Sequence, residues 1–279
     1  MNKHQRLYKR VIDYAKTTQV IRLVEMNGSR VNSNVQSDDY QDFDIVYYVD
    51  NYESFNKEKD WVERFGEILI MQTKDDQIPN PDDRDKWYIY LIQFKNGTRL
   101  DLTIQDINDF EDKQRDSLSE IILDKDNLSQ PRPSNESSYY VAKPNGKDFS
   151  VCVNEFYWVC PYIAKGLARH QFIYAVKHLS IIRSQYEKLL DWWIGYQYNF
   201  EISVGKGKSR YIDLLPDIYY QTYINSYVGV DFDEILKATI QLMDMFDRLA
   251  QILAKDMHFT HDNQKKNNVK NYILKLIKK

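Results

Sequence analysis

The periodicity of the chain changes once, near residue 135, and this change limits the folds open to it. Before that point the apolar residues form short runs rich in Val, Ile, Tyr and Phe, as in β-strands, separated by turn residues. Beyond residue 147 they recur at helical spacing over long segments. Residues 130–138, between the two patterns, have linker composition. We therefore expect an α+β domain at residues 1–135, with a mixed sheet and helices, followed by an α-helical domain at 136–279.

The first domain is expected to begin with a helix at 3–17 and to continue mainly as strands, with a further helix around 60–65. The strands are predicted at 20–24, 43–49, 68–71, 87–94, 99–104 and 121–123. Asn96-Gly97 predicts a hairpin between the fourth and fifth of these. Helices in the second domain are predicted at 151–168, 171–198, 232–254 and from 267 onward. Pro161 is expected to kink or interrupt the first of them.

Three aspartates are placed to share one face of the predicted sheet. Asp42 and Asp44 stand two residues apart at the start of one strand, and Asp101 lies on another. Side chains two apart on a strand point to the same face, and a nearby strand can bring the third beside them. Three crowded carboxylates repel one another unless divalent cations neutralise them, and Mg²⁺ prefers oxygen ligands. We expect these aspartates to be catalytic and to hold two Mg²⁺ ions about 4 Å apart.

A Gly-Ser turn upstream strengthens this interpretation. Gly28 and Ser29 follow a predicted strand, and twelve residues, 30–41, separate them from Asp42. Glycine lets backbone N–H groups approach a phosphate closely. An isolated Asp-x-Asp pair also occurs by chance on charged surfaces, whereas the ordered combination favours a nucleotide site.

The arrangement resembles the nucleotidyltransferase superfamily typified by DNA polymerase β, and more closely the aminoglycoside 6-adenylyltransferases that modify streptomycin. In the first domain the resemblance is carried by Glu25–Asn32, Tyr40–Ile45, Asp60-Trp61, Phe65-Gly66, Ile70–Gln72, Leu100–Thr103 and Leu123–Asp126. In the second it is carried by Cys152–Val159, Tyr162–Arg169 and Ser203–Lys206. It spans residues 5 to 210, and beyond about Tyr211 only the helical pattern is shared.

Membership of that family implies transfer of AMP from ATP to a hydroxyl of streptomycin, with release of pyrophosphate. Asp42 and Asp44 would hold the metals, and Asp101 would act as a ligand or as the general base. The helical domain would complete the nucleotide and acceptor sites. Other small-molecule or protein acceptors remain open, as does a regulatory module that binds nucleotide without turnover.

Residues beyond the carboxylates are candidates for binding the triphosphate. Ser29 is expected to donate to a phosphate, and the planar guanidinium of Arg30 to brace it, with a turn residue and a surface arginine as the alternatives. Lys165 and Lys206 are expected to add positive charge from the helical domain, although either is also compatible with a solvated surface.

The guanidinium groups of streptomycin favour carboxylates and aromatic faces at the acceptor site. Glu155 and Trp158 combine the two on one predicted helix, and Asp191 repeats the combination beside Trp192 and Trp193. An interdomain salt bridge is the alternative for Glu155, and a place in the core is the alternative for the tryptophans.

Composition excludes several other partners. The formal net charge is −3 and the sequence pI about 6.0, so there is no basic field for a polynucleotide, which also disfavours a template-directed polymerase. No apolar run approaches the roughly 18 to 20 residues of a membrane span, so we expect a cytoplasmic protein without a membrane partner. Cys152 and Cys160 are expected to be buried thiols, and His258 and His261 to face solvent. The lysine-rich end is expected to be a solvated helix rather than a membrane contact.

Overall fold

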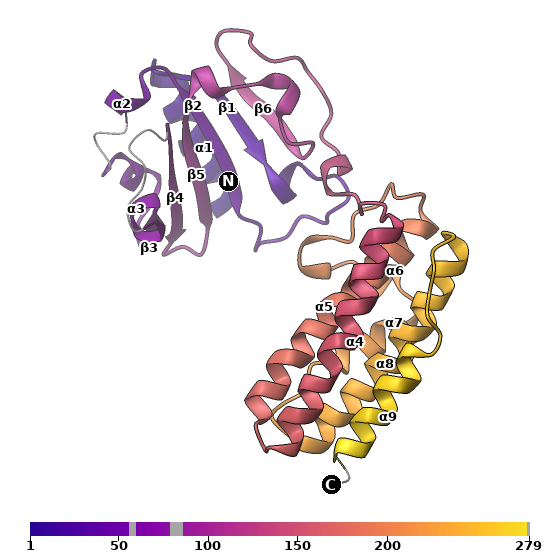
Figure 1. The fold of residues 1–279 in the computed structure, drawn as a ribbon. Helices are drawn as coiled ribbons and strands as arrows, with labels where there is room; N and C mark the ends of the chain where they lie inside the picture. The colour runs from indigo at the N-terminus through magenta and orange to yellow at the C-terminus, as the bar shows by residue number, and fades with distance from the viewer. Residues whose placement is uncertain (56–59, 79–85, 278–279) are drawn as a thin grey trace. The chain divides into compact units, whose positions relative to one another are not determined.

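A computed structural model describes residues 1–55, 60–78 and 86–277 of the protein (Figure 1). The chain divides into two compact units, Met1–Ser138 and Tyr139–Lys279. The first contains a mixed sheet with helices and the second is built from helices (Figure 1). This confirms the predicted α+β class with a helical second part. The sequence placed the boundary between residues 135 and 136, in the same linker.

A six-stranded sheet in the order β3-β4-β5-β2-β1-β6 forms the first unit. Its strands are β1 (Ile21–Asn27), β2 (Phe43–Val49), β3 (Ile68–Thr73), β4 (Trp87–Phe94), β5 (Arg99–Asp106) and β6 (Ser119–Asp124). Strands β2 and β5 pair in parallel, and the other described neighbours pair antiparallel. The helices are α1 (Lys3–Thr17), α2 (Tyr52–Phe55) and α3 (Lys74–Gln77), with 3₁₀ turns η1 (Gly28–Val31) and η2 (Asp60–Phe65). The expected helix at 60–65 is therefore a 3₁₀ helix.

The core of this unit lies between the sheet and α1, which covers one face (Figure 1). Phe43, Ile45 and Tyr47 of β2 are buried on that face, where the Tyr47 hydroxyl donates to the carbonyl oxygen of Val11 on α1 at 2.6 Å. Side chains alternate along a strand, so Asp44 points to the opposite face. The fold thereby separates an apolar face under α1 from a polar face that carries the aspartates.

The second unit consists of long helices and shorter connecting ones. Its helices are α4 (Gly146–Ala168), α5 (Phe172–Gln197), α6 (Tyr211–Leu214), α7 (Asp217–Ile224), α8 (Phe232–Asp256) and α9 (Lys265–Ile277). Phe156 of α4 stacks on Phe246 of α8 with ring centroids 3.7 Å apart, within the core of this unit. Cys152 and Cys160 are buried free thiols, as predicted. Within the described ranges, no helix combines the length and apolar character that a bilayer span requires.

Helix α4 continues through Pro161, so the expected interruption does not occur; packing in the helical core stabilises the helix despite the missing N–H. One expectation for this unit is wrong. The side chain of His261 does not face solvent. It is 4% exposed, and its Nε2 lies 3.2 Å from Oδ1 of Asp247. Tyr157 donates to the same carboxylate oxygen at 3.1 Å, so Asp247 provides His261 with a buried polar partner.

Candidate active site

The three predicted catalytic aspartates lie at one end of the central parallel strand pair. Asp44 on β2 is directly opposite Asp101 on β5, and on its other side it pairs with Asn27 at the end of β1. Neighbouring strands are about 4.8 Å apart, so the two carboxylates leave the sheet side by side. Asp42 immediately precedes β2, two residues from Asp44. The sheet therefore concentrates negative charge on the face opposite α1.

Gly28 leaves room for the Asp44 carboxylate beside the other aspartates. Its φ is +79°, a left-handed conformation that side chains rarely adopt, and a Cβ atom there would lie 2.6 Å from Oδ2 of Asp44. Its own N–H donates to the carbonyl oxygen of Leu118 at 3.0 Å. The structure thus gives this glycine a specific task, which is to let the backbone pass next to the Asp44 carboxylate.

Arg99 is a member of the site that sequence analysis missed. Its Nε and Nη2 donate to Oδ1 and Oδ2 of Asp101 at 2.8 and 2.9 Å, and Nε lies 3.6 Å from Oδ2 of Asp42. Hydrogen bonding to Asp101 raises the pKa of this guanidinium, and the charges of Asp42 and Asp44 add to the rise. The available signal was the Arg-x-Asp spacing on one strand, which places both side chains on the same face.

Arg30 is directed to the backbone around Asp42. Its Nε donates to the carbonyl oxygen of Asp42 at 2.8 Å and its Nη2 to that of Gln41 at 2.5 Å, while the guanidinium lies 3.7 Å from the centre of the Phe43 ring. Burial lowers the pKa of Arg30, and nearby carboxylates, that of Asp42 foremost, oppose the change. These contacts fix the entry into β2. The structure therefore assigns the arginine a positioning role.

The loop between Gly28 and Asp42 is tied down at both ends. Ser29 lies in η1, and its carbonyl oxygen accepts a hydrogen bond from Nε2 of Gln41 at 3.2 Å. Glu136, which is buried, accepts hydrogen bonds from the side-chain amides of Asn32 and Asn34 at 2.9 and 3.0 Å. These contacts hold the Gly-Ser turn close to the aspartates, as the sequence pattern requires.

The donor set suits a divalent cation, although the side chains are not closed around one. Three carboxylates supply the hard oxygen ligands that Mg²⁺ prefers, and Gly28 leaves room beside Oδ2 of Asp44. Within residues 1–55, 60–78 and 86–277, no three or more His, Cys, Asp or Glu side chains are arranged to hold a metal. In this open arrangement both oxygens of Asp101 are bound by Arg99.

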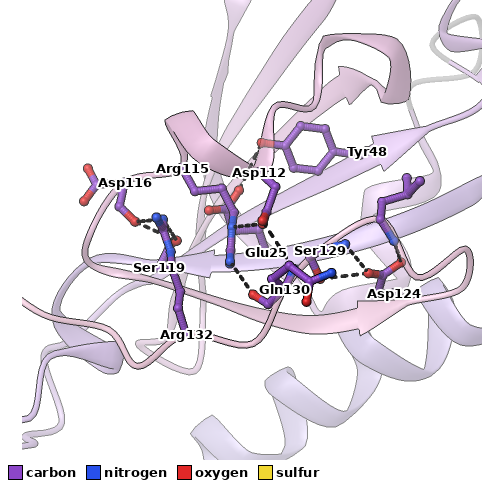
Figure 2. Close-up of polar contacts among 11 residues, drawn as sticks. Glu25, Tyr48, Asp112, Arg115, Asp116, Ser119, Asp124, Ser129, Gln130 and Arg132 are labelled. Atoms are coloured by element: carbon purple, nitrogen blue, oxygen red, sulfur yellow. Dashed lines mark hydrogen bonds and ion pairs between the residues drawn. The ribbon is translucent and has the colours of Figure 1, made fainter.

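Further polar contacts gather around β1, β2 and β6 (Figure 2). The Tyr48 hydroxyl donates to the buried Glu25 at 3.0 Å, and its ring meets Phe110 edge-on. Arg115, whose side chain is 2% exposed, pairs with Asp112 at 2.8 Å and donates to the backbone of a neighbouring loop. Segment 107–117 is thereby fastened over β1 and β2.

The candidates in the second unit fall into two groups. Glu155, Trp158 and Lys165 share α4, at positions three and seven residues apart that lie along one stripe of the helix. The Trp158 side chain is 65% exposed, and Nζ of Lys165 lies 5.3 Å from the centre of the Tyr162 ring. An exposed tryptophan beside a half-buried glutamate is consistent with an acceptor surface.

The second group consists of Asp191 and Lys206, and Asp191 is already bound by side chains of its own unit. Oδ1 of Asp191 accepts a hydrogen bond from the buried Tyr211 hydroxyl at 2.6 Å, and Oδ2 pairs with Nζ of Lys208. Lys206 is exposed in the 3₁₀ turn η6 (Lys206–Lys208). Asp191 therefore fastens that loop, and Trp192 and Trp193 beside it pack against the helical core.

Comparison with known proteins identifies the family of this chain. Residues 1–276 match the model of the streptomycin adenylyltransferase family. The aminoglycoside 6-adenylyltransferase of Bacillus subtilis (strain 168) is 30% identical over 265 residues, covering 94% of this chain and 93% of the relative. That of Campylobacter jejuni is 29% identical and covers 100% and 97%.

Among solved structures, that of an aminoglycoside 6-adenyltransferase from Bacillus subtilis aligns with 99% of this chain and 98% of its own, at 25% identity and a TM-score of 0.48. The family match covers nearly the whole chain, including the aspartates, the Gly-Ser turn and the helical unit. The chain therefore belongs to the streptomycin adenylyltransferase family and is an adenylyltransferase.

Proposed function

We propose that this enzyme transfers AMP from ATP to a hydroxyl of an aminoglycoside, most specifically streptomycin, and releases pyrophosphate. The observation that supports this best is the direct pairing of Asp44 with Asp101 across parallel strands, next to a glycine that leaves room for the carboxylate. The relatives of this chain are named for action on aminoglycosides at position 6. Their name supplies the acceptor class, and the family's name supplies streptomycin.

Asp42, Asp44 and Asp101 are proposed to hold Mg²⁺, which would neutralise phosphate charge and polarise the α-phosphate. Asp101 is a ligand or accepts the proton of the attacking hydroxyl, which must come within about 3 Å of it. Ser29 is proposed to donate to a phosphate from the Gly-Ser turn. Arg30 acts indirectly, since its hydrogen bonds fix the backbone of Asp42.

The helical unit is proposed to complete the nucleotide and acceptor sites. Lys165 and Lys206 would add positive charge for the triphosphate. Glu155 and Trp158, which lie on one stripe of α4, would meet a guanidinium of the acceptor through charge and through the aromatic face. Asp191 is proposed as a further acceptor contact, and binding would then require it to give up or share its pairing with Lys208.

The test is an incubation of the purified protein with Mg²⁺, ATP and streptomycin, with pyrophosphate release and product mass measured together. The expected result is release of pyrophosphate with a product heavier by one adenylyl group, lost in Asp101→Asn. Pyrophosphate without modified streptomycin, or transfer to a different aminoglycoside in a parallel panel, would refute the acceptor and keep the chemistry. A folded protein that binds ATP and transfers nothing to any acceptor would contradict the proposal as a whole.

A further inference from the structure

Arg99 occupies the position in which a cation is most needed. Its guanidinium binds both oxygens of Asp101 and approaches Oδ2 of Asp42, so one positive group bridges two of the three aspartates. A two-armed arginine–carboxylate pair is geometrically demanding and leaves neither Asp101 oxygen pointing away from the guanidinium. We propose that Arg99 is an internal counter-ion, a positioning residue that holds Asp101 near Asp42 before metal binding and competes with the divalent cation for that carboxylate.

The electrostatics of the site require such a group. Three carboxylates gathered at the end of β2 and β5 repel one another, and this repulsion opposes folding unless positive charge is close. Arg30 supplies part of that charge but is held by the carbonyl oxygens of Gln41 and Asp42. Arg99, in contrast, contacts the carboxylates of Asp42 and Asp101 directly. Without it the unliganded site would be more negative and less stable.

The Arg99 guanidinium can also leave the Asp101 carboxylate without disturbing the sheet. Its side chain is 41% exposed, compared with 20% for Asp101, so the guanidinium lies at the solvent side of the pair. An exposed ion pair is weak, and its release requires a change of side-chain rotamers but no rearrangement of the sheet. A divalent cation, with greater charge and a preference for carboxylate oxygen, is a strong competitor for the same atoms. The competition sets the metal affinity of the free enzyme.

This inference rests on the proposed metal-binding role of the aspartates. It predicts that loss of Arg99 strengthens metal binding, whereas a substitution that merely disturbs the structure would weaken it. In Arg99→Met, which keeps a long side chain and removes the charge, nucleotide-free protein is expected to bind Mn²⁺ about two- to fivefold more tightly than wild type, measured by the electron paramagnetic resonance of free Mn²⁺. The variant is also expected to melt at a lower temperature in EDTA and to recover more than wild type when Mn²⁺ is added. A residue with only a structural role would weaken metal binding when removed.

The matched control is Arg22→Met. Arg22 also makes a two-armed pair, with Asp126, in the same unit but outside the site, and its loss should leave Mn²⁺ affinity unchanged. Arg99→Lys keeps the charge without the planar fork and is expected to bind Mn²⁺ with intermediate affinity. It serves as the test if Arg99→Met does not fold.

The outcomes separate the inference from the function on which it rests. Wild-type protein that binds Mn²⁺ no better than the Asp42→Asn, Asp44→Asn double variant would overturn both the metal site and the role of Arg99. Wild-type protein that binds Mn²⁺ through these aspartates, together with equal or weaker binding in Arg99→Met, would overturn the counter-ion role alone. Tighter binding in Arg99→Met with no change in Arg22→Met supports it.

Discussion

Asp44 is the residue on which the site depends most, because it lies between Asn27 and Asp101 and fills the space that Gly28 leaves. In Asp44→Asn the side chain keeps its shape and loses its charge, so turnover is expected to fall by about three orders of magnitude while the fold is retained. AMP transfer and circular dichroism measure the two effects. Asp50→Asn is the control and should retain normal turnover, because Asp50 is exposed and directly follows the far end of β2. Near-normal transfer by Asp44→Asn would remove this carboxylate from the mechanism.

Gly28 offers a test of how closely the backbone must approach that carboxylate. Gly28→Ala combines a left-handed φ with a contact of 2.6 Å to Oδ2 of Asp44, so both stability and activity should decline. Gly97→Ala is matched in φ, at +81°, but its Cβ would meet only the end of the Lys3 side chain at 3.5 Å. Both variants should lose about 1 kcal/mol from backbone strain, measured by urea denaturation. Only Gly28→Ala should also lose AMP transfer, and equal activities would show that the close approach is unimportant.

At the scale of elements, the turn that follows β6 is held by one carboxylate. Asp124 accepts hydrogen bonds from the N–H groups of Asp126, Leu128 and Ser129 and from the Ser129 hydroxyl, at 2.8–3.2 Å. Figure 2 shows Asp124 and Ser129 in contact. Burial raises the pKa of Asp124, but these hydrogen bonds outweigh it and leave the pKa below the ordinary 3.8. The ionised form is therefore the one that stabilises the turn.

This shift has a defined sign in the pH dependence of stability. A carboxyl with a depressed folded pKa contributes stability above its unfolded pKa, and that contribution is lost as the pH falls through the folded value. Asp124→Asn is therefore expected to lower the free energy of unfolding by about 1 kcal/mol at pH 7, and by progressively less below about pH 4. Urea denaturation of both proteins from about pH 7 to about pH 3 measures the difference. A difference that stays constant over this range would contradict the role of ionised Asp124.

The elements themselves were largely readable from the sequence, because their signals are local. The strands Phe43–Val49 and Trp87–Phe94 begin and end where the apolar alternation does, and Asn96-Gly97 joins β4 to β5 as predicted. The parallel pairing of β2 with β5 joins residues far apart in the chain and leaves no local pattern. The short helices α6 and α7 carry too few turns for a periodic signal.

The same distinction separates the site residues. The aspartates are predicted from spacing and resemblance, whereas Arg99 and the partners of Asp191 are not. Lys208 and Tyr211 reach Asp191 because α5 and the following loop fold back on each other, which spacing does not encode. Pro161 shows the converse, since α4 continues through it where packing in the core stabilises the helix. Tertiary contacts decided each case.

At the scale of the whole molecule, the chain has two hydrophobic cores. Among the described residues, one core draws only on the first unit, from Leu7 to Ile104, and the other only on the second, from Phe149 to Ile273. The six-stranded sheet lies entirely in the first unit, and helices α4 to α9 lie entirely in the second. A change in one core should therefore lower the stability of its own unit first.

Phe246→Ala tests this separation. Phe246 is fully buried and stacks on Phe156 at 3.7 Å, so its truncation should cost about 3–5 kcal/mol. Hydrogen exchange read by mass spectrometry is expected to show faster exchange in α4, α5 and α8 with the strands of the first unit still protected. Phe94→Ala, an equally buried change in β4, should give the reverse pattern. Faster exchange throughout both units in either variant would show that the two cores unfold together.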